Sequence, residues 1–171
     1  INNYEIGYSQ VNALNPANYS ETYYTGQFNS ETLSVDVILN YATDGVAHNH
    51  NNSPDRLHNF SAEDIYKLAY YWSIGKINNL STFSYTVVTD STSYILMIDD
   101  PNAFINFAQS WFDSEKHFEA FKIHLYENHK YGKTGNTLAQ DEKNFLSAVQ
   151  AQGPGLNGCG LKLFKANQNM T

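Results

Sequence analysis

The chain has 171 residues, of which 42% are hydrophobic, and its 17 acidic and 10 basic residues give a formal net charge of -7. This length and hydrophobic content fit one globular domain with a core of ordinary size. The acidic balance and the absence of any run of Lys or Arg disfavour binding to nucleic-acid backbones, and no apolar stretch is long enough to span a bilayer. The single cysteine, Cys159, excludes an internal disulfide and a cysteine-rich zinc module. It does not indicate whether the protein works in an oxidising or a reducing compartment. Because the chain begins at Ile1 rather than Met, we expect it to be a part of a longer protein.

The N-terminal half predicts strands followed by one helix. Residues 4–11 and 22–28 are rich in Tyr and Thr and are expected to form short strands. Residues 33–47 give the clearest strand pattern, because apolar side chains alternate with mostly polar ones, which indicates one wet face. A polar loop over 51–60 then leads to Ser61, which opens a helix that ends by Gly75. The apolar stripe of this helix is Ile65, Leu68, Ala69 and Trp72.

The C-terminal half predicts a hairpin, then helices, then one more strand. Residues 83–88 and 94–98 are β-rich and flank a polar turn, so they are expected to pair as a hairpin. After Pro101 the apolar residues follow a helical period, and a Gly-containing break at 132–136 precedes a helix over 138–150. A closing strand is expected over 161–164. No internal repeat or linker is visible, so the fold class is a single mixed α/β or α+β domain.

Three residues between the expected strand and helix have the types and spacing of metal ligands. His48 and His50 are two residues apart on an extended segment, so both imidazoles project to the same side, and the helix that starts near Ser61 can present Asp64 to the same ion. Two nitrogens, one carboxylate oxygen and an open fourth position are typical of a catalytic Zn²⁺ site rather than a structural one. The sequence therefore predicts that His48, His50 and Asp64 bind zinc.

The same residues also have simpler explanations. A His-x-His pair on a strand occurs by chance in many proteins. Ser61-x-x-Asp64 is also what a helix start requires, because a Ser at the N-cap accepts from a backbone N–H of the first turn and an acid there favours the helix dipole. The two interpretations are compatible, since a capped helix start is one way to present an Asp to a metal.

The order of these parts resembles the JAB/MPN (JAMM) metalloproteases over roughly residues 4–100. That family has a Glu and then a Gly on an early strand, a strand that ends in His-x-His-Pro, and a Ser-x-x-Asp that opens a helix. Glu5-Ile6-Gly7, His48-Asn49-His50 and Ser61-Ala62-Glu63-Asp64 match these elements, and Glu5 lies 43 residues before His48. Asn51 stands where the family has Pro, and the stretch from His50 to Ser61 is a few residues longer.

The resemblance implies a single mixed β-sheet flanked by helices, of the JAB/MPN (cytidine-deaminase-like) type, over residues 1–171, with 102–171 a C-terminal helical extension and closing strand. It also implies roles: His48, His50 and Asp64 bind zinc, Glu5 is the general base for the metal-bound water, and Ser61 helps to hold the oxyanion. The reaction would be hydrolysis of a peptide or isopeptide bond, with a peptide or protein-tail substrate. Glu21 and Glu31 are alternative carboxylates, although neither is followed by Gly two residues later.

Several alternatives remain open at this point. The protein can instead be a catalytically silent relative that serves as a protein-interaction or metal-binding module. His58 lies in the loop between the expected ligands and is expected to be solvated, while His117, His124 and His129 are expected on or near a helix surface. The consecutive His-Asn-His letters do not indicate an HNH nuclease, because that motif distributes its residues over a ββα unit and the charge balance is acidic.

Overall fold

The computed structural model describes residues 5–11, 17, 20–25, 37–50, 57–89, 92–150 and 158–166. These residues form one six-stranded mixed sheet with helices, in the strand order β2-β1-β3-β4-β5-β6. The predicted α/β or α+β class with a single mixed sheet is therefore confirmed. The strands are β1 (Ile6–Val11), β2 (Ser20–Thr25), β3 (Gly45–Asn49), β4 (Ser84–Val88), β5 (Ser93–Ile98) and β6 (Leu161–Lys165). The helices are α1 (Ala62–Ser73), α2 (Pro101–Phe112), α3 (Glu115–Lys122), the π-helix η1 (Ile123–Asn128) and α4 (Leu138–Gln150).

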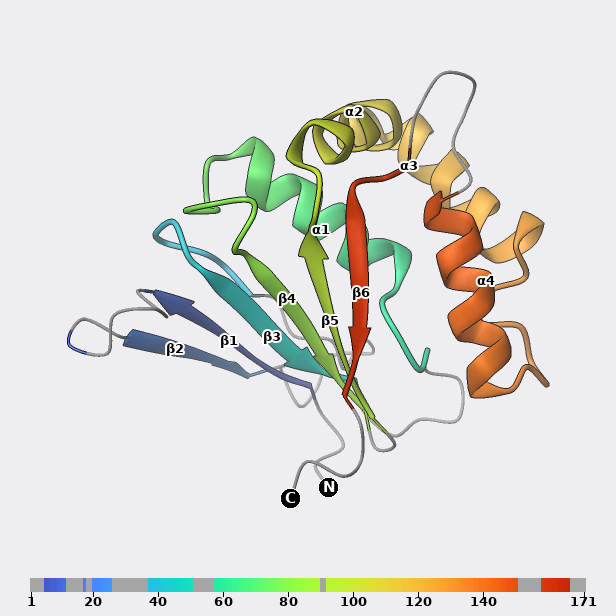
Figure 1. The fold of residues 1–171 in the computed structure, drawn as a ribbon, viewed down its shortest axis with the longest axis horizontal. Helices are drawn as coiled ribbons and strands as arrows, with labels where there is room; N and C mark the ends of the chain where they lie inside the picture. Colours follow the sequence, from blue (N-terminus) through green and yellow to red (C-terminus); the bar gives the residue numbers. More distant parts are fainter. Residues whose placement is uncertain are drawn as a thin grey trace.

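The one parallel pair of described strands, β3 with β4, places α1 beside the sheet. All other neighbouring strands are antiparallel. Parallel strands cannot be joined by a tight turn, and the connection from β3 to β4 contains α1 as its crossover helix. Figure 1 shows α1 behind the strands, with α2 and α3 at the top and α4 at the right. The end of β3 and the start of α1 are therefore brought together on one side of the sheet.

The core lies between the sheet and the helices. From the sheet it contains alternate side chains such as Val46, Tyr85, Val87 and Leu96, all at most 2% exposed. The helices contribute the apolar stripe predicted on α1, and the aromatic residues of α2 and α3 join the same cluster. No helix among the described residues is long and apolar enough to cross a membrane.

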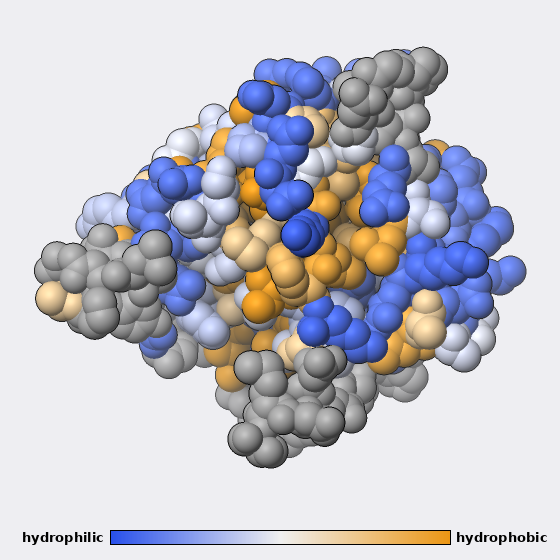
Figure 2. Space-filling view, in the orientation of Figure 1, coloured by the Kyte–Doolittle hydropathy of each residue, from blue (hydrophilic) through white to orange (hydrophobic). Residues whose placement is uncertain are grey.

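The other face of the sheet carries no helix in the described part of the chain. Ile95 on β5 and Phe164 on β6 are register partners on this face and are 37% and 43% exposed. Figure 2 shows hydrophobic residues gathered at the centre of this face, with hydrophilic residues around them. The layers are therefore a sheet and one set of helices.

The prediction of a strand over 33–47 is wrong for most of its described part. Residues 37–44 form no strand apart from one isolated bridge at Thr43, and β3 begins only at Gly45. The alternation itself is real, because Val37 and Leu39 are buried while Ile38 is 66% exposed. Side chains satisfy part of the backbone here: the Tyr71 hydroxyl donates to the Val37 carbonyl at 2.7 Å. The alternation of apolar and polar residues thus predicted which side chains are buried, but it did not predict whether the segment forms a hydrogen-bonded strand. Residues 33–36 lie outside the described part.

Where the chain is described, the other sequence predictions for secondary structure agree with the structure within a few residues; residues 4, 26–28 and 51–56 lie outside the described part. The helix after Ser61 ends at Ser73, and Gly75 follows with a φ of +68° that favours glycine. The hairpin of β4 and β5, the helix over 138–150 and the closing strand are all present. The closing strand pairs with β5 and adds the sixth strand to the sheet.

Candidate metal centre

His48, His50 and Asp64 meet in the structure. His48 lies on β3 and His50 follows the end of that strand, where its backbone N–H still donates to the Val88 carbonyl at 2.9 Å. This bond keeps residue 50 in the extended pattern, so both imidazoles project to the side that α1 covers. His48 Nε2 lies 3.1 Å from Asp64 Oδ1, and His50 Nε2 lies 3.4 Å from Asp64 Oδ2. The two Nε2 atoms are 3.3 Å apart.

The three side chains are buried, with exposed fractions of 6%, 9% and 7% in sequence order. Their ligand atoms all lie within 4.8 Å of one another, so one ion can contact all three. Buried charged and polar groups are costly unless they are paired or coordinate a metal. The group can therefore hold a metal ion, and the prediction of these three residues as a cluster agrees with the geometry.

The start of α1 fixes Asp64. Ser61 is the N-cap, and its hydroxyl accepts from the Asp64 backbone N–H at 3.1 Å. In return, Asp64 Oδ2 accepts from the Ser61 backbone N–H at 2.8 Å and from its hydroxyl at 2.9 Å. This is a complete capping box, so the simpler explanation of Ser61-x-x-Asp64 is correct as far as it goes. The same box also orients the carboxylate toward the two histidines.

Neighbouring groups orient the ligands further. His50 Nδ1 lies 2.9 Å from the Leu57 carbonyl oxygen. Because a carbonyl only accepts, Nδ1 carries the proton, and the Nε2 lone pair is directed at the centre of the site. On the other side, the Tyr85 hydroxyl donates to Asp64 Oδ1 at 3.4 Å. His50 and Asp64 are thus each held by a hydrogen-bond partner outside the three ligands, as is common for metal ligands.

Electrostatics keep the Asp64 carboxylate ionised. Burial would raise the pKa of Asp64, but His48 and His50 outweigh it and hold that pKa well below its ordinary value. Burial alone would lower the pKa of His50, yet the hydrogen bond and charge of Asp64 leave it above its ordinary value. Asp64 is therefore an anion at neutral pH, which is the form that binds a cation.

Glu5 lies next to this group. It precedes β1 directly, and because Gly7 pairs with His48 in the antiparallel register, Glu5 falls opposite His50. Its side chain is only 4% exposed. Its charge contributes to raising the pKa of both His50 and Tyr85, so the carboxylate is within electrostatic range of the centre. The structure thus brings the predicted base and the predicted ligands to one place.

The alternative residues do not join the site. Glu21 pairs with Gln10 at the far end of the β1–β2 ladder and is exposed. His58 is exposed, while His117, His124 and His129 belong to α3, η1 and the residue after η1. Glu31 and Asn51 lie outside the described residues.

Sequence reasoning did not identify three groups that support the site: Leu57, Tyr85 and Tyr126. The Tyr126 hydroxyl accepts from the Ala62 backbone N–H at 2.9 Å, in the first turn of α1. Tyr85 reaches Asp64 because β4 lies parallel to β3, with Tyr85 opposite Val46. Only the expected hairpin strand around Tyr85 was visible in the sequence, and nothing local shows its parallel pairing with β3.

Comparison of the chain with protein-family models, with curated proteins and with solved structures gave no match.

Proposed function

We propose that this protein is a zinc-dependent hydrolase that cleaves a peptide or isopeptide bond with a metal-activated water. The observation that carries the proposal is the convergence of two imidazoles and one carboxylate, with a second buried carboxylate opposite His50 on the neighbouring strand. Three protein ligands of this kind leave a coordination position open for water, as catalytic zinc sites require. The family resemblance adds that these four residues follow the order found in JAB/MPN metalloproteases.

The chain supplies distinct groups for each requirement of the reaction. When bound, zinc lowers the pKa of a coordinated water to roughly 7 and so supplies hydroxide at neutral pH. His48, His50 and Asp64 hold the ion. Glu5 takes the proton of the water and passes it to the leaving amine, a role that needs a carboxylate close to the metal but not bound to it. No protein nucleophile is needed.

Ser61 acts first as a positioning residue in this proposal. Its hydroxyl donates to Asp64 Oδ2 and accepts from the Asp64 backbone N–H, so it fixes the carboxylate ligand. The oxyanion role that the resemblance implies requires the hydroxyl proton to turn away from Asp64 toward the substrate oxygen. Ser61 can thus serve the ligand before the substrate binds and the oxyanion during reaction.

The first test is metal content. The purified chain is treated with a chelator, reconstituted with zinc and analysed by mass spectrometry, with His50→Ala and His117→Ala beside it. His117 is a matched control because it is an exposed histidine outside the site. About one zinc per chain in the parent and in His117→Ala, but not in His50→Ala, supports the proposal. No stoichiometric zinc in any of the three proteins would favour a silent interaction module and would overturn it.

The second test separates metal binding from hydrolysis. We expect Glu5→Gln to keep zinc and lose at least about a hundredfold in hydrolysis, because general acid–base catalysis contributes roughly that much or more. Glu21→Gln is the matched control, since Glu21 is an exposed glutamate on the adjacent strand. Hydrolysis is followed by mass spectrometry of a peptide and isopeptide library. Full activity in Glu5→Gln would refute Glu5 as the base.

A further inference from the structure

A cavity of about 220 Å³ lies where α1 passes beside α2 (Figure 1). We call it the helix cavity. It is lined from α1 by Tyr66, Ala69, Tyr70, Trp72 and Ser73, and from α2 and its C-cap by Ala108, Gln109, Phe112 and Asp113. A helix turns by about 100° per residue, so Tyr66 and Tyr70 lie on the side of α1 roughly opposite Asp64. The helix cavity therefore lies on a different face of α1 from the candidate metal centre.

Small side chains leave the space, and two tyrosines lie at its opening. Ala69 and Ala108 are both 3% exposed and lie between the two helices, where larger side chains would fill the gap. Tyr66 and Tyr70, in contrast, are 37% and 47% exposed. A small ligand that enters from solvent can therefore reach both tyrosine rings.

The rings that line the cavity present their faces in two directions. The Tyr66 and Tyr70 rings are within 16° of parallel, with centroids 6.4 Å apart. The Phe112 ring lies 5.9 Å from Tyr66 at an angle of 75°. The face of an aromatic ring is negative, and it attracts a cation within about 6 Å of its centroid. Cavities lined by several rings in different orientations are the sites that recognise quaternary ammonium groups.

The charge of the lining is complementary to a cation. Among the described residues of the lining, Asp113 is the only charged one, and its side chain is 52% exposed. His117 Nδ1 lies 2.5 Å from Asp113 Oδ1, and this hydrogen bond holds the pKa of Asp113 below its ordinary value. Asp113 is therefore an anion at neutral pH, while His117 is outside the lining. The net charge of -7 for the whole chain also attracts cations.

A cation of the chain itself already lies on an adjoining ring. Lys122 Nζ is 5.1 Å from the centroid of the Phe118 ring, and that ring stacks on Tyr66 with centroids 4.8 Å apart. Lys122 also pairs with Glu119, so the ion pair contributes to its position. Within the described part of the chain, no lysine or arginine lies over the Tyr66 or Tyr70 ring. The ring faces of the cavity are therefore available to a cation from outside the protein.

We propose that the helix cavity binds the quaternary ammonium group of a small soluble ligand of the choline type, with Tyr66, Tyr70 and Phe112 around the cation and Asp113 beside it. A quaternary ammonium has no N–H groups, so a lining of rings suits it, whereas a primary ammonium has three donors that need acceptors. A phosphate beside the cation, as in a lipid head group, would find no lysine or arginine in the described lining. The binding needs neither zinc nor hydrolysis, so it goes beyond the proposed function and is tested independently of it.

The test measures choline binding to the purified full chain by NMR titration. Two further probes isolate the cause of binding. One is the neutral analogue of choline in which a carbon atom replaces the nitrogen, and the other is ethanolamine, which keeps the charge on a primary ammonium. We expect choline to bind about tenfold more tightly than either probe.

Each of the other outcomes overturns a stated part of the proposal. Equal binding of choline and its neutral analogue would show that the cavity is merely apolar. Equal binding of ethanolamine would overturn the choice of a quaternary ammonium. No measurable binding of choline would overturn the site. Chelator-treated and zinc-loaded chains should bind choline equally, so a failure of zinc binding would leave these results unchanged.

Variants with matched controls locate the ligand. Tyr70→Leu keeps an apolar side chain but removes a ring, and we expect it to weaken choline binding about fivefold. Its control is Tyr41→Leu, at a tyrosine that is 77% exposed and outside the lining. Asp113→Asn should weaken binding about threefold, as for an exposed ion pair, whereas Asp99→Asn removes the same charge outside the cavity and should have no effect.

Thermal denaturation of each variant shows whether it is folded. If Tyr70→Leu does not fold, Asp113→Asn still tests the site, because it changes an exposed side chain. Unchanged choline binding in folded Tyr70→Leu would overturn the role of the rings, and unchanged binding in Asp113→Asn would overturn the role of the carboxylate. Equal losses in the controls would overturn the location.

A last measurement separates a soluble ligand from a lipid head group. Phosphatidylcholine vesicles are sedimented with the full chain in the presence and absence of free choline. We expect the chain to stay in the supernatant in both cases, because the described lining offers no cation to the lipid phosphate. Co-sedimentation that free choline abolishes would overturn the choice of a soluble ligand.

Discussion

Two buried regions of this molecule differ in what their burial achieves. The candidate metal centre of His48, His50 and Asp64 is buried but polar. The aromatic cluster of α2 and α3 is apolar, with Phe107 and Phe121 buried and Trp111 and Phe112 half-buried. This aromatic cluster consists of Phe107, Trp111, Phe112 and Phe121, with ring centroids of Phe121 lying 5.0 to 5.8 Å from the other three.

This difference indicates which of the two regions stabilises the fold. Removing aromatic rings from water stabilises the folded chain directly, and paired rings add to this. Burying two imidazoles and a carboxylate costs desolvation free energy that their mutual hydrogen bonds only partly return. A buried polar group that costs stability is expected to have a function. Substitutions in the aromatic cluster should therefore mainly lower stability, whereas substitutions in the polar group should mainly change metal binding.

The largest expected effect is on stability, in the aromatic cluster. Phe121 is fully buried, so Phe121→Ala should lower the free energy of unfolding by about 3–5 kcal/mol through lost burial and a cavity. Phe164→Ala, at a side chain that is 43% exposed, should cost less than about 1 kcal/mol. Urea denaturation measures both. Similar losses in the two variants would show that the cluster is not the stabilising core.

The second prediction concerns the effect of zinc on the stability of the folded protein. Zinc at about a hundred times its dissociation constant should raise the free energy of unfolding by about 2.7 kcal/mol, because it binds the folded site. The urea midpoint of the chelated protein with and without zinc measures this. His50→Ala should show no increase, while Phe164→Ala should show the full one. An undiminished increase in His50→Ala would mean that zinc binds elsewhere.

Two N-cap serines allow a closer comparison. Ser61 caps α1 and holds Asp64, whereas Ser114 caps α3 and its hydroxyl accepts from the His117 backbone N–H at 3.3 Å. Either change to Ala should cost about 1 kcal/mol of stability. Only Ser61→Ala should also weaken zinc binding, by about tenfold, because it releases the carboxylate ligand. Competition with a fluorescent zinc chelator measures the affinity, and equal affinities in both variants would contradict the positioning role.

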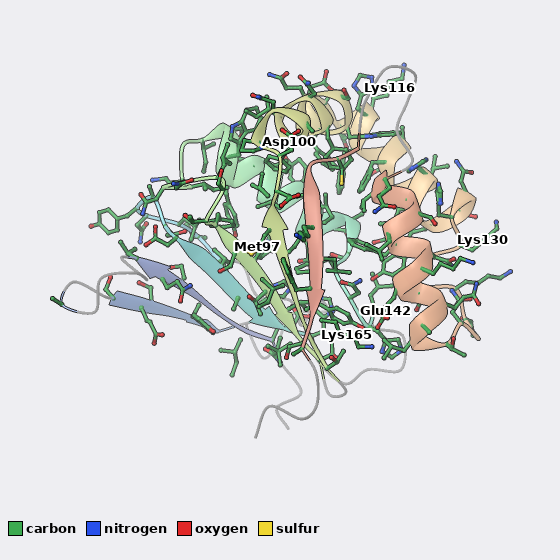
Figure 3. The ribbon with its side chains drawn as sticks, viewed as in Figure 1. Met97, Asp100, Lys116, Lys130, Glu142 and Lys165 are labelled. Atoms are coloured by element: carbon green, nitrogen blue, oxygen red, sulfur yellow. The ribbon has the colours of Figure 1, made fainter. Side chains whose placement is uncertain are left out.

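The smallest effect should come from an ion pair outside both regions. Glu142 accepts from the Tyr94 hydroxyl at 2.5 Å and from Lys165 Nζ at 2.6 Å. Figure 3 shows Glu142 and Lys165 pointing toward each other from α4 and β6. Burial would raise the pKa of Glu142, but Lys165 and Tyr94 leave it below the ordinary value of 4.5. A depressed pKa means that the pair stabilises the protein above about pH 4.5 and that this contribution disappears as the pH falls through the folded-state pKa.

We therefore expect Glu142→Gln to lose less than about 1 kcal/mol at pH 7 and progressively less below pH 4.5. Urea denaturation from pH 3 to pH 7 measures the difference between the variant and the parent. A difference that grows as the pH falls would contradict the sign of the pKa shift. Zinc binding at pH 7 should not change.

Local signals in the sequence predicted that His48, His50 and Asp64 lie together. The alternation of His48 and His50, and a helix that starts at Ser61, depend on neighbouring residues alone, and both are present in the structure. The parallel pairing of β3 with β4 then places α1 beside the sheet, which brings Asp64 to the imidazoles. The helix cap was predicted for the same reason, because Ser61 and Asp64 are three residues apart.

Long-range pairing explains what could not be predicted. The alternation over 33–47 was interpreted as a strand, yet among its described residues the ladder forms only from Gly45. Hydropathy alternation reports which side chains face the core, but a strand also needs a partner at the right register. The contacts of Tyr85 and Tyr126 depend on the pairing of β3 with β4 and on the packing of η1, neither of which has a local signature.

The short separation of the three ligands along the chain has a consequence for how the centre assembles during folding. His48 and Asp64 are 16 residues apart, whereas Glu5 lies 43 residues before His48. Loop-closure entropy grows with chain length, so uniting the three ligands costs about 1 kcal/mol less than adding the carboxylate of Glu5. One β-α unit is therefore enough to gather all three ligands, while Glu5 arrives only when β1 joins the sheet. Under the proposed function, a folding intermediate could hold the ion before it could hydrolyse anything.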